Sequence, residues 1–357
     1  MYIEQFGLER WFGKHEHGAD IMLAESGIRP LASSDFDTDP GELNYVIPTD
    51  GDPEFRAEVA ERYGRGENEV CFTCGTQEAN LLVFLSLLSE DDHVVVVTPT
   101  YQALHAVPDA VGDVTRVSLT EGDWRLDVDA VAEAMREETR LVVLNNPNNP
   151  TGRYHSEEKV RELYDLAAEN DAYLLCDEVY RLLADEPIPP VASMGEYGIS
   201  TTSLTKAYGL AGLRFGWIAG PEDVVQDAVE WKDYTTISPP IFGQHVARQA
   251  LGEREDEILT ENRELAESNR DIVREFVEAH DLDWFDPIGV NGFISVPDGF
   301  VDGREFCTAV VEQESVVLAP GDLFGYDQYW RIGFGLPTDE LEEGLERVAR
   351  VVESAEN

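Results

Sequence analysis

Lysine is almost missing from this sequence, and basic residues of any kind are few. The 357 residues include 26 Lys and Arg against 72 Asp and Glu, and only four of the basic residues are lysines. The formal net charge of −46 repels polyanions, so neither nucleic acid nor an anionic membrane surface is an expected partner. The chain has no run of about 18 apolar residues that would span a membrane. It also begins without the basic and apolar segments of a secretion signal, which predicts a cytoplasmic protein.

The acidic residues are scattered along the chain rather than gathered in a tail, and arginine stands where lysine is common in other proteins. This composition is typical of salt-loving organisms with a high internal salt concentration. At molar salt the Debye length is only about 3 Å, so repulsion between like surface charges costs little. We therefore expect a halophilic protein, which concerns its habitat and not its reaction.

Cysteine is scarce as well, with residues only at Cys71, Cys74, Cys176 and Cys307. The first two have the Cys-x-x-Cys spacing of a zinc or redox motif, but no second close pair supplies the further ligands that zinc sites use. The run at residues 15–17, His-Glu-His, is too short to bind a metal without partners. We expect no metal, and thiols that pack as small apolar side chains in a reducing compartment.

Apolar runs and helical patterns alternate between about residue 54 and residue 250. The runs at 69–73, 93–99 and 140–147 predict buried strands, and the segments at 53–63 and 156–171 predict helices. Strands that alternate with helices indicate an α/β fold, in which a mainly parallel sheet has helices on both faces.

The pattern changes after residue 250. A long charged helix at 256–280 leads into short strands and a final helix at 338–353. We predict a large α/β domain at residues 40–250 and a smaller α+β domain, formed by residues 1–39 together with 251–357.

Polar residues stand where the predicted strands of the large domain end. Ligands of parallel α/β sheets bind at the carboxyl ends of strands, so these residues are predicted to form one site. The segments are 74–76, 100–101, 145–152, 177–180 and 203–206.

Lys206 lies between hydroxyl residues and a glycine-rich turn, and residues 197–221 include no acidic residue. Burial in such surroundings disfavours the charged amine, and a neutral amine can form a Schiff base with an aldehyde. The alternative is an ordinary surface lysine, and the rarity of lysine in this chain counts against it.

Asp177 ends the apolar run AYLLC, and a buried carboxylate needs a partner. A protonated pyridine nitrogen would serve, and the pairing would keep the ring able to accept electrons. The alternatives are a helix cap and an ion pair with an arginine. Asn149, in the unusual turn NNPNNPTG, has an amide that can bond a ring hydroxyl and a carboxylate.

Four residues have the chemistry of a phosphate site. Gly75 and Thr76 open a predicted helix, whose free N–H groups attract anions, and Ser203 and Arg214 add a hydroxyl and a guanidinium. Tyr101 has an aromatic face that suits a cofactor ring, although a lone Tyr after a strand is more often part of the core.

Together these segments resemble the pyridoxal-phosphate enzymes of the aspartate aminotransferase fold type, class I and II. The motifs NNPNNPTG, DEVY, SLTKAYGLAGLRFGW and RIGFG occur in the order and spacing of that family, and the resemblance covers residues 40 to 350. It implies a mainly parallel seven-stranded sheet, pyridoxal 5′-phosphate as cofactor, and a homodimer with shared active sites.

The resemblance also implies a role for each matching residue around the cofactor ring. Lys206 forms the Schiff base and moves the proton, and Asp177 pairs with the pyridine nitrogen. Tyr180 and Asn149 bond the ring hydroxyl, and Tyr101 stacks on the ring.

Other matching residues are implied to bind the phosphate and the substrate. Arg331, helped by Asn149, holds the substrate α-carboxylate. Tyr45 reaches the phosphate of the neighbouring subunit. Within one chain, the implied phosphate ligands are Cys74, Gly75, Thr76, Ser203 and Arg214.

We predict an aminotransferase that moves an amino group between an L-amino acid and a 2-oxo acid. The alternatives are another reaction on the same cofactor, such as β-elimination or cyclisation, and a histidinol-phosphate-type aminotransferase, which KAYGLAGLRFGW also resembles. A non-catalytic sensor is disfavoured because no basic helix-turn-helix segment is visible. The N-terminal segment lacks the family's usual glycine- and proline-rich lead-in, so the substrate is not specified. Lys14, His15 and Arg29 are candidates for a second carboxylate by position alone.

Overall fold

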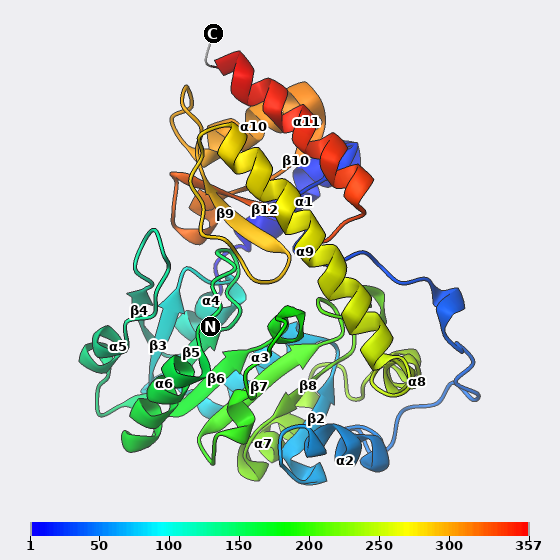
Figure 1. Cartoon of the computed structure of the whole chain (residues 1–357). Coiled ribbons are helices and arrows are strands. Elements are labelled where there is room, and N and C mark those ends of the chain that lie inside the picture. Colours follow the sequence, from blue (N-terminus) through cyan, green and yellow to red (C-terminus); the bar gives the residue numbers. More distant parts are fainter. Residues whose placement is uncertain (1, 356–357) are drawn as a thin grey trace.

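A seven-stranded sheet forms the centre of the larger part of the molecule (Figure 1). The computed structural model describes residues 2–355. The strand order is β2-β8-β7-β6-β5-β3-β4, and only β8 runs antiparallel to its neighbours. The predicted α/β fold is confirmed, while β4 was not predicted. The strands are β2 Val70–Thr73, β3 His93–Thr98, β4 Asp113–Ser118, β5 Thr139–Asn145, β6 Tyr173–Asp177, β7 Gly198–Ser203 and β8 Gly216–Ala219.

Helices cover both faces of this sheet because alternate side chains of its strands point to opposite sides. On one face, Val95 and Val97 of β3 belong to the same core as α5 and α6. On the other, Val94 and Val96 pack with α3, α4 and α7. The helices of this part are α2 Pro53–Glu61, α3 Thr76–Leu87, α4 Ala103–Val111, α5 Val128–Ala134, α6 Glu157–Glu169, α7 Glu222–Lys232 and α8 Ile241–Ala250.

A smaller α+β part is built around the antiparallel sheet β11-β12-β9, and the long helix α9 joins it to the larger part (Figure 1). The boundaries predicted at residues 40 and 250 stay predictions. The elements of the smaller part are α9 Glu255–Ala279, β9 Asn291–Ser295, α10 Gly303–Glu314, β10 Val316–Val317, β11 Ala319–Pro320, β12 Tyr329–Gly333 and α11 Thr338–Ala355.

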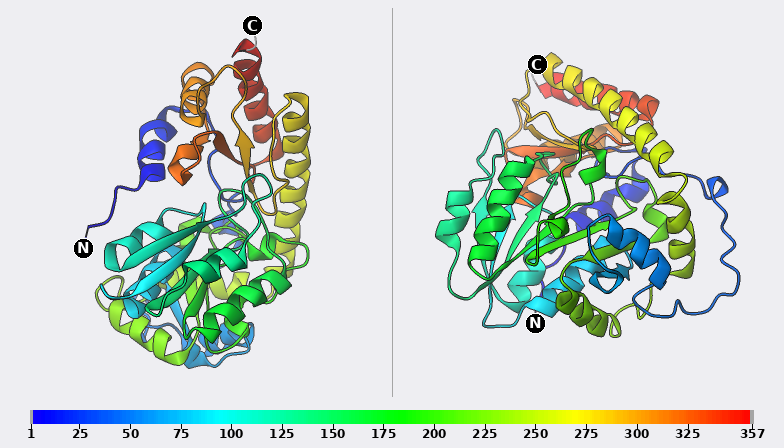
Figure 2. Two further views of the ribbon diagram at one scale, coloured as in Figure 1. Left: turned by 90° about the vertical axis from the view of Figure 1, so that its left-hand side faces the viewer. Right: turned by 60° about the horizontal axis from the view of Figure 1, so that its bottom comes forward.

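The N-terminal segment packs with the C-terminal part of the chain (Figure 2). Strand β1, Ile21–Met22, pairs in parallel with β10. Helix α1, Gly7–His15, is fixed by Trp11, whose indole N–H donates to the Leu318 carbonyl at 2.8 Å. Residues near the start of the chain therefore lie against the smaller part and close to the carboxyl end of β3, where the Gly7 backbone N–H donates to Gln102.

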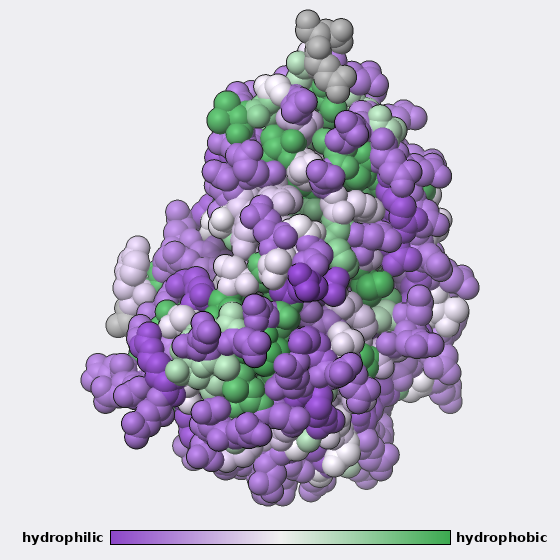
Figure 3. Space-filling model, turned by 60° about the vertical axis from the view of Figure 1, so that its left-hand side comes forward, coloured by the Kyte–Doolittle hydropathy of each residue, from purple (hydrophilic) through white to green (hydrophobic). Residues whose placement is uncertain are grey.

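The outer surface is mostly hydrophilic, as expected from the many charged residues in the sequence. The face shown in Figure 3 is largely hydrophilic, with apolar areas between the hydrophilic residues. In the described part of the chain, no helix is both long and apolar enough to cross a membrane.

Lys232 is a second unusual lysine, and the sequence did not reveal it. It ends α7 with its side chain fully buried, 3.3 Å from a carboxylate oxygen of Glu78 on α3. The Glu78 carboxylate also accepts hydrogen bonds from the Cys74 backbone N–H at 2.6 Å and from the hydroxyls of Thr235 and Thr236. The pair therefore links α7 to the turn that precedes α3.

Replacing Lys232 by methionine should lower the free energy of unfolding by about 3–5 kcal/mol, because Glu78 would stay buried without its cation. The measurement is urea denaturation at fixed salt. Lys159→Met is the matched control, since Lys159 pairs with Glu162 on the surface and its loss should cost less than about 1 kcal/mol. Equal stability of the Lys232→Met protein and the unaltered protein would contradict this account.

Candidate active site

A cavity of about 280 Å³ lies at the carboxyl ends of the central strands. The ends of β5, β6 and β7 meet at one edge of the sheet, where Asn145 is in register with Asp177 and Asp177 with Thr201. Side chains from the smaller part and from α1 close the opposite side. The cavity collects nine of the residues predicted for the site: Thr76, Tyr101, Asn149, Asp177, Tyr180, Ser203, Lys206, Arg214 and Arg331.

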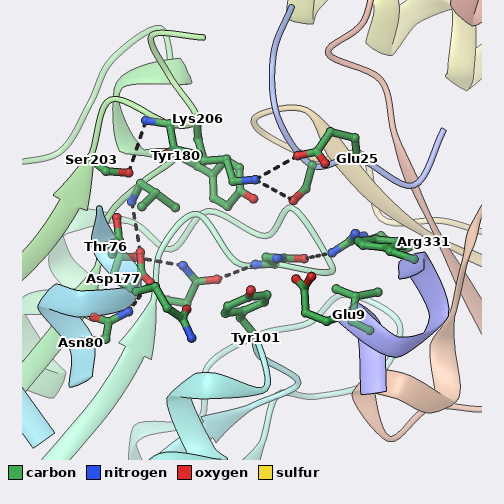
Figure 4. Close-up of a pocket in the computed structure, with 18 of the residues that line it drawn as sticks. Glu9, Glu25, Thr76, Asn80, Tyr101, Asp177, Tyr180, Ser203, Lys206 and Arg331 are labelled. Atoms are coloured by element: carbon green, nitrogen blue, oxygen red, sulfur yellow. Dashed lines mark hydrogen bonds and ion pairs between the residues drawn. The ribbon is translucent and has the colours of Figure 1, made fainter. Parts of the chain in front are cut away.

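The Lys206 amine points into this cavity, but its surroundings are not apolar (Figure 4). Its Nζ is 3.4 Å from a carboxylate oxygen of Glu25 and 3.2 Å from the Ser26 hydroxyl. Burial favours a lower pKa for Lys206, but the charges of Tyr180 and Glu25 oppose it and the pKa is raised overall. The expectation of a neutral amine is therefore wrong for the cofactor-free protein, because the fold brings in a carboxylate from far away in the sequence.

Asp177 ends β6 and is 5% exposed. Its carboxylate accepts a hydrogen bond from the Asn80 side-chain amide at 2.9 Å and a longer one from the Val179 backbone N–H. Burial raises the pKa of Asp177 to about 6, with Asn80 opposing the shift. The hydrogen-bond partners are amides rather than an arginine, so the carboxylate keeps its negative charge uncompensated for a ligand cation.

Asn80 was not predicted as a site residue, although its position four residues after Thr76 on a predicted helix could have indicated it. It lies one helical turn after Thr76 on α3, so both side chains face the same side of that helix. The Thr201 hydroxyl donates to the Asn80 amide oxygen at 2.6 Å, which turns the amide N–H₂ toward Asp177.

The first turn of α3 and Arg214 form a site for an anion. Gly75 has a φ of +80°, and a Cβ there would lie 2.6 Å from a terminal nitrogen of Arg214, so only glycine fits. Among residues 2–355, the buried Thr76 hydroxyl has no hydrogen-bond partner. Ser203 lines the same cavity. Helix N–H groups, a guanidinium and hydroxyl groups together suit a phosphate.

Arg331 projects from β12 and is 1% exposed. Its guanidinium donates to the Asn149 side-chain oxygen at 2.8 Å and to the Ala24 carbonyl at 2.6 Å. Its Nε is buried and has no partner within the described residues. Burial lowers the pKa of Arg331, but an arginine remains cationic at neutral pH and can bind a carboxylate.

Two tyrosines border the space between Lys206 and Arg331. Tyr180 is almost fully buried, and Tyr101 is half-buried with its ring 5.1 Å from that of Phe6. Burial, and next the charge of Glu9, raise the pKa of Tyr101. Tyr101 therefore keeps its phenol proton at neutral pH.

Three predicted residues do not line the cavity. Gly75 borders the anion site through its backbone without lining the cavity, and the backbone N–H of Cys74 donates to Glu78. Tyr45 is 68% exposed on an extended segment, and its role toward a second subunit stays a prediction. None of Lys14, His15 and Arg29, the candidates for a second carboxylate, lines the cavity either; Arg29 pairs with Glu261 at 2.8 Å.

Sequence reasoning missed most of the N-terminal side of the cavity. The residues from this segment are Leu8, Glu9, Phe12, Glu16, Glu25 and Ser26. The spacing of Leu8, Phe12 and Glu16, four residues apart, was the available signal that one helical face is shared.

Comparison with known proteins agrees with this geometry. Residues 24–348 match the family described as aminotransferase class I and II. The chain is 32% identical to capreomycidine synthase of Streptomyces vinaceus, over 96% of this chain and 92% of that protein. It is 28% identical to aromatic-amino-acid aminotransferase 2 of Thermococcus litoralis, over 87% of this chain and 84% of the relative.

A solved structure extends the likeness to the whole fold. The crystal structure of a PLP-dependent aminotransferase from Streptococcus suis has a TM-score of 0.93 and 31% identity, and covers 99% of both chains. The chain therefore belongs to the class I and II aminotransferase family of PLP-dependent enzymes, with the aminotransferase fold of type I.

Proposed function

We propose that this chain binds pyridoxal 5′-phosphate and transfers an amino group between an L-amino acid and a 2-oxo acid. The observation that carries the proposal is the meeting of three different groups in one cavity: the Lys206 amine, the buried Asp177 carboxylate and the anion site at Gly75, Thr76 and Arg214. Each group has a counterpart on the cofactor, namely its aldehyde, its ring nitrogen and its phosphate.

The residues present fit this cofactor. The unpartnered Thr76 hydroxyl and the glycine-lined approach to Arg214 leave donors and space for a phosphate. Lys206 would supply the amine that attaches to the aldehyde, and Asp177 would hold a proton at the ring nitrogen. When bound, the cofactor stabilises negative charge that develops on the substrate α-carbon.

The remaining residues would bind and orient the amino acid. Arg331 would hold the α-carboxylate by two parallel hydrogen bonds, exchanging its contact with Asn149 for the substrate. The Lys206 amine would then remove the proton at the α-carbon and return it in the reverse half-reaction. Tyr180 and Tyr101 would limit water and fix the plane of the cofactor.

A dimer in the cytoplasm is part of the same proposal. Leu43, Tyr45 and Ile47 expose apolar surface on an extended segment, and Tyr234 and Phe242 expose more. Exposed apolar groups of this size often mark an interface between chains. Four free cysteines are in keeping with a reducing compartment, and the acidic surface with high salt.

A second reaction on the same cofactor is the alternative that an observation favours. The relative at 32% identity is named as a synthase rather than an aminotransferase. Elimination or cyclisation would use the same cavity residues. A histidinol-phosphate-type activity would need a second anion site for the substrate phosphate. A non-catalytic sensor that binds DNA lacks support, because the net charge of −46 repels nucleic acid.

Replacing Lys206 by alanine should lower turnover by at least about 10²–10⁴-fold, since the proton-transfer group is removed. The visible absorbance of the lysine-attached cofactor should disappear as well. Lys159→Ala, a surface control, should keep both properties. Full turnover, or an unchanged spectrum, in the Lys206→Ala protein would reject the assignment.

Cofactor affinity should fall as the pH drops below about 6, because Asp177, with its pKa raised to about 6, becomes protonated and no longer attracts the ring N–H. The fall should approach tenfold per pH unit. Absorbance titration of the cofactor-free protein measures it. The Asp177→Asn protein should bind more weakly at pH 8 and lack this step. Parallel profiles for the two proteins would contradict the role of Asp177.

A panel of amino acids, each supplied with 2-oxoglutarate, distinguishes the two reactions. Amino transfer should consume 2-oxoglutarate and stop without an acceptor, because the amino group stays on the cofactor. Continued release of ammonia or pyruvate without any oxo acid would instead establish a lyase. A cyclised product formed without an acceptor would establish a cyclase.

A further inference from the structure

Three carboxylates line the cavity on the side formed by the N-terminal segment. Glu9 lies on α1, Glu16 follows that helix, and Glu25 follows β1. Glu9 and Glu16 are seven residues apart, or about two helical turns, so they lie on one face. Leu8 and Phe12 lie on the same face and add apolar surface between them. We call this set of five residues the acidic wall.

The acidic wall is fixed to both parts of the molecule. Trp11 anchors α1 to the Leu318 carbonyl in the smaller part. At the other end, the Gly7 backbone N–H donates to the side-chain oxygen of Gln102 at 2.8 Å. The wall is therefore held across the cavity opening rather than left as a loose terminus.

The carboxylates of the wall have little internal compensation. Glu25 pairs with Lys206, and among residues 2–355 the one ion pair of Glu16 is with the exposed His17, at 3.8 Å. Glu9 makes no ion pair within the part of the chain that the structure describes. Figure 4 shows Glu9 directed into the space beside Tyr101 and Arg331.

The charges of the cavity can be matched one by one with the proposed cofactor and substrate. Its cations are Lys206, Arg214 and Arg331. Under the proposed function these meet the cofactor aldehyde, the phosphate and the α-carboxylate, while Asp177 meets the ring nitrogen. Among the described residues that line the cavity, no further cation remains for a second substrate carboxylate. Within the described residues Glu9 has no ion-pair partner and Glu16 has only the exposed His17, and Glu25 would lose Lys206 when that amine is attached.

Arg331 fixes where the other end of a substrate lies. Its buried, unpartnered Nε and its position on β12 place the α-carboxylate beside the smaller part. Glu9 lies beside Arg331 in the cavity (Figure 4), so the wall begins next to that point. A side chain leaving the α-carbon toward the opening would therefore run along the acidic wall.

We propose that the cavity selects an amino acid whose side chain ends in a cation, an ammonium or a guanidinium group. Glu9 and Glu16 bind the cation, and Leu8 and Phe12 contact the methylene stem that carries it. Glu25 adds negative charge at the inner end of the wall. This inference rests on the proposed function, because it uses Arg331 as the carboxylate site.

The test measures binding without turnover, in cofactor-loaded Lys206→Ala protein at fixed low salt. Isothermal calorimetry gives the Kd of arginine and of its neutral analogue citrulline, of lysine and of norleucine, and of glutamate. Each cationic amino acid should bind at least about tenfold more tightly than its neutral analogue, and glutamate more weakly than either, because an ion pair with the exposed wall carboxylates is little screened at low salt and exceeds a neutral hydrogen bond.

Variants of the wall show which residues cause the preference. In Glu9→Gln and Glu16→Gln proteins, the ratio of arginine affinity to citrulline affinity should fall toward one. Glu312→Gln is the matched control, because Glu312 is exposed on α10 and does not line the cavity. It should keep the ratio. The same ratios of kcat/KM in protein that retains Lys206 provide a second reading if the alanine variant folds poorly.

The outcomes separate this inference from the proposed function. Equal affinity for arginine and citrulline, or tighter binding of glutamate, would overturn the inference even if amino transfer is observed. Tighter binding of glutamate is the result expected if a second subunit supplies a cation to the cavity. Preferential binding of arginine without any amino transfer would reject the proposed function and support the inference.

Discussion

A charge inside this fold needs a partner, and that constraint explains most of the site. A buried ion with neither a counter-charge nor a hydrogen bond is costly, so each one bonds at least one group from another segment. Asn80 meets Asp177, Asn149 meets Arg331, Glu25 meets Lys206, and Glu78 meets Lys232. Two of these contacts join the two parts of the molecule, because Arg331 and Glu25 come from the smaller part while Asn149 and Lys206 lie in the turns after β5 and β7. Ligand groups that replace these contacts would therefore change how the two parts are held together.

The strand ends set the positions of the site residues, and the turns that follow the strands carry most of the reactive side chains. Parallel β5, β6 and β7 end at one edge, so residues scattered over the sequence become neighbours there. Where β8 turns back, Arg214 in a left-handed conformation and Gly75 with its positive φ allow close approach of a guanidinium to the start of α3. The N-terminal segment then adds the wall that the sheet cannot provide.

The sequence was sufficient for the fold class and the family, because strand patterns and four ordered motifs are local signals. It placed Lys206, Asp177 and Arg331 in one site for the same reason. It could not find Glu25 or Asn80, since their importance arises from contacts with residues far away in the sequence. The same limit led to the wrong expectation of a neutral Lys206: residues 197–221 contain no acid, but β1 brings Glu25 to it. The rarity of lysine did not by itself identify the reactive residue. Lys232, another of the four lysines, is buried as the ion-pair partner of Glu78.

The central claim is that Lys206 is the point of attachment for the cofactor, and it can be tested on the protein directly. Pyridoxal 5′-phosphate is added, the linkage is reduced with borohydride, and the digested peptides are analysed by mass spectrometry. With four lysines in the chain, each site is resolved by its own peptide. The account predicts one phosphopyridoxyl group per chain, on the peptide that contains Lys206. A label on Lys232 or Lys14 instead, or no label at all, would contradict it.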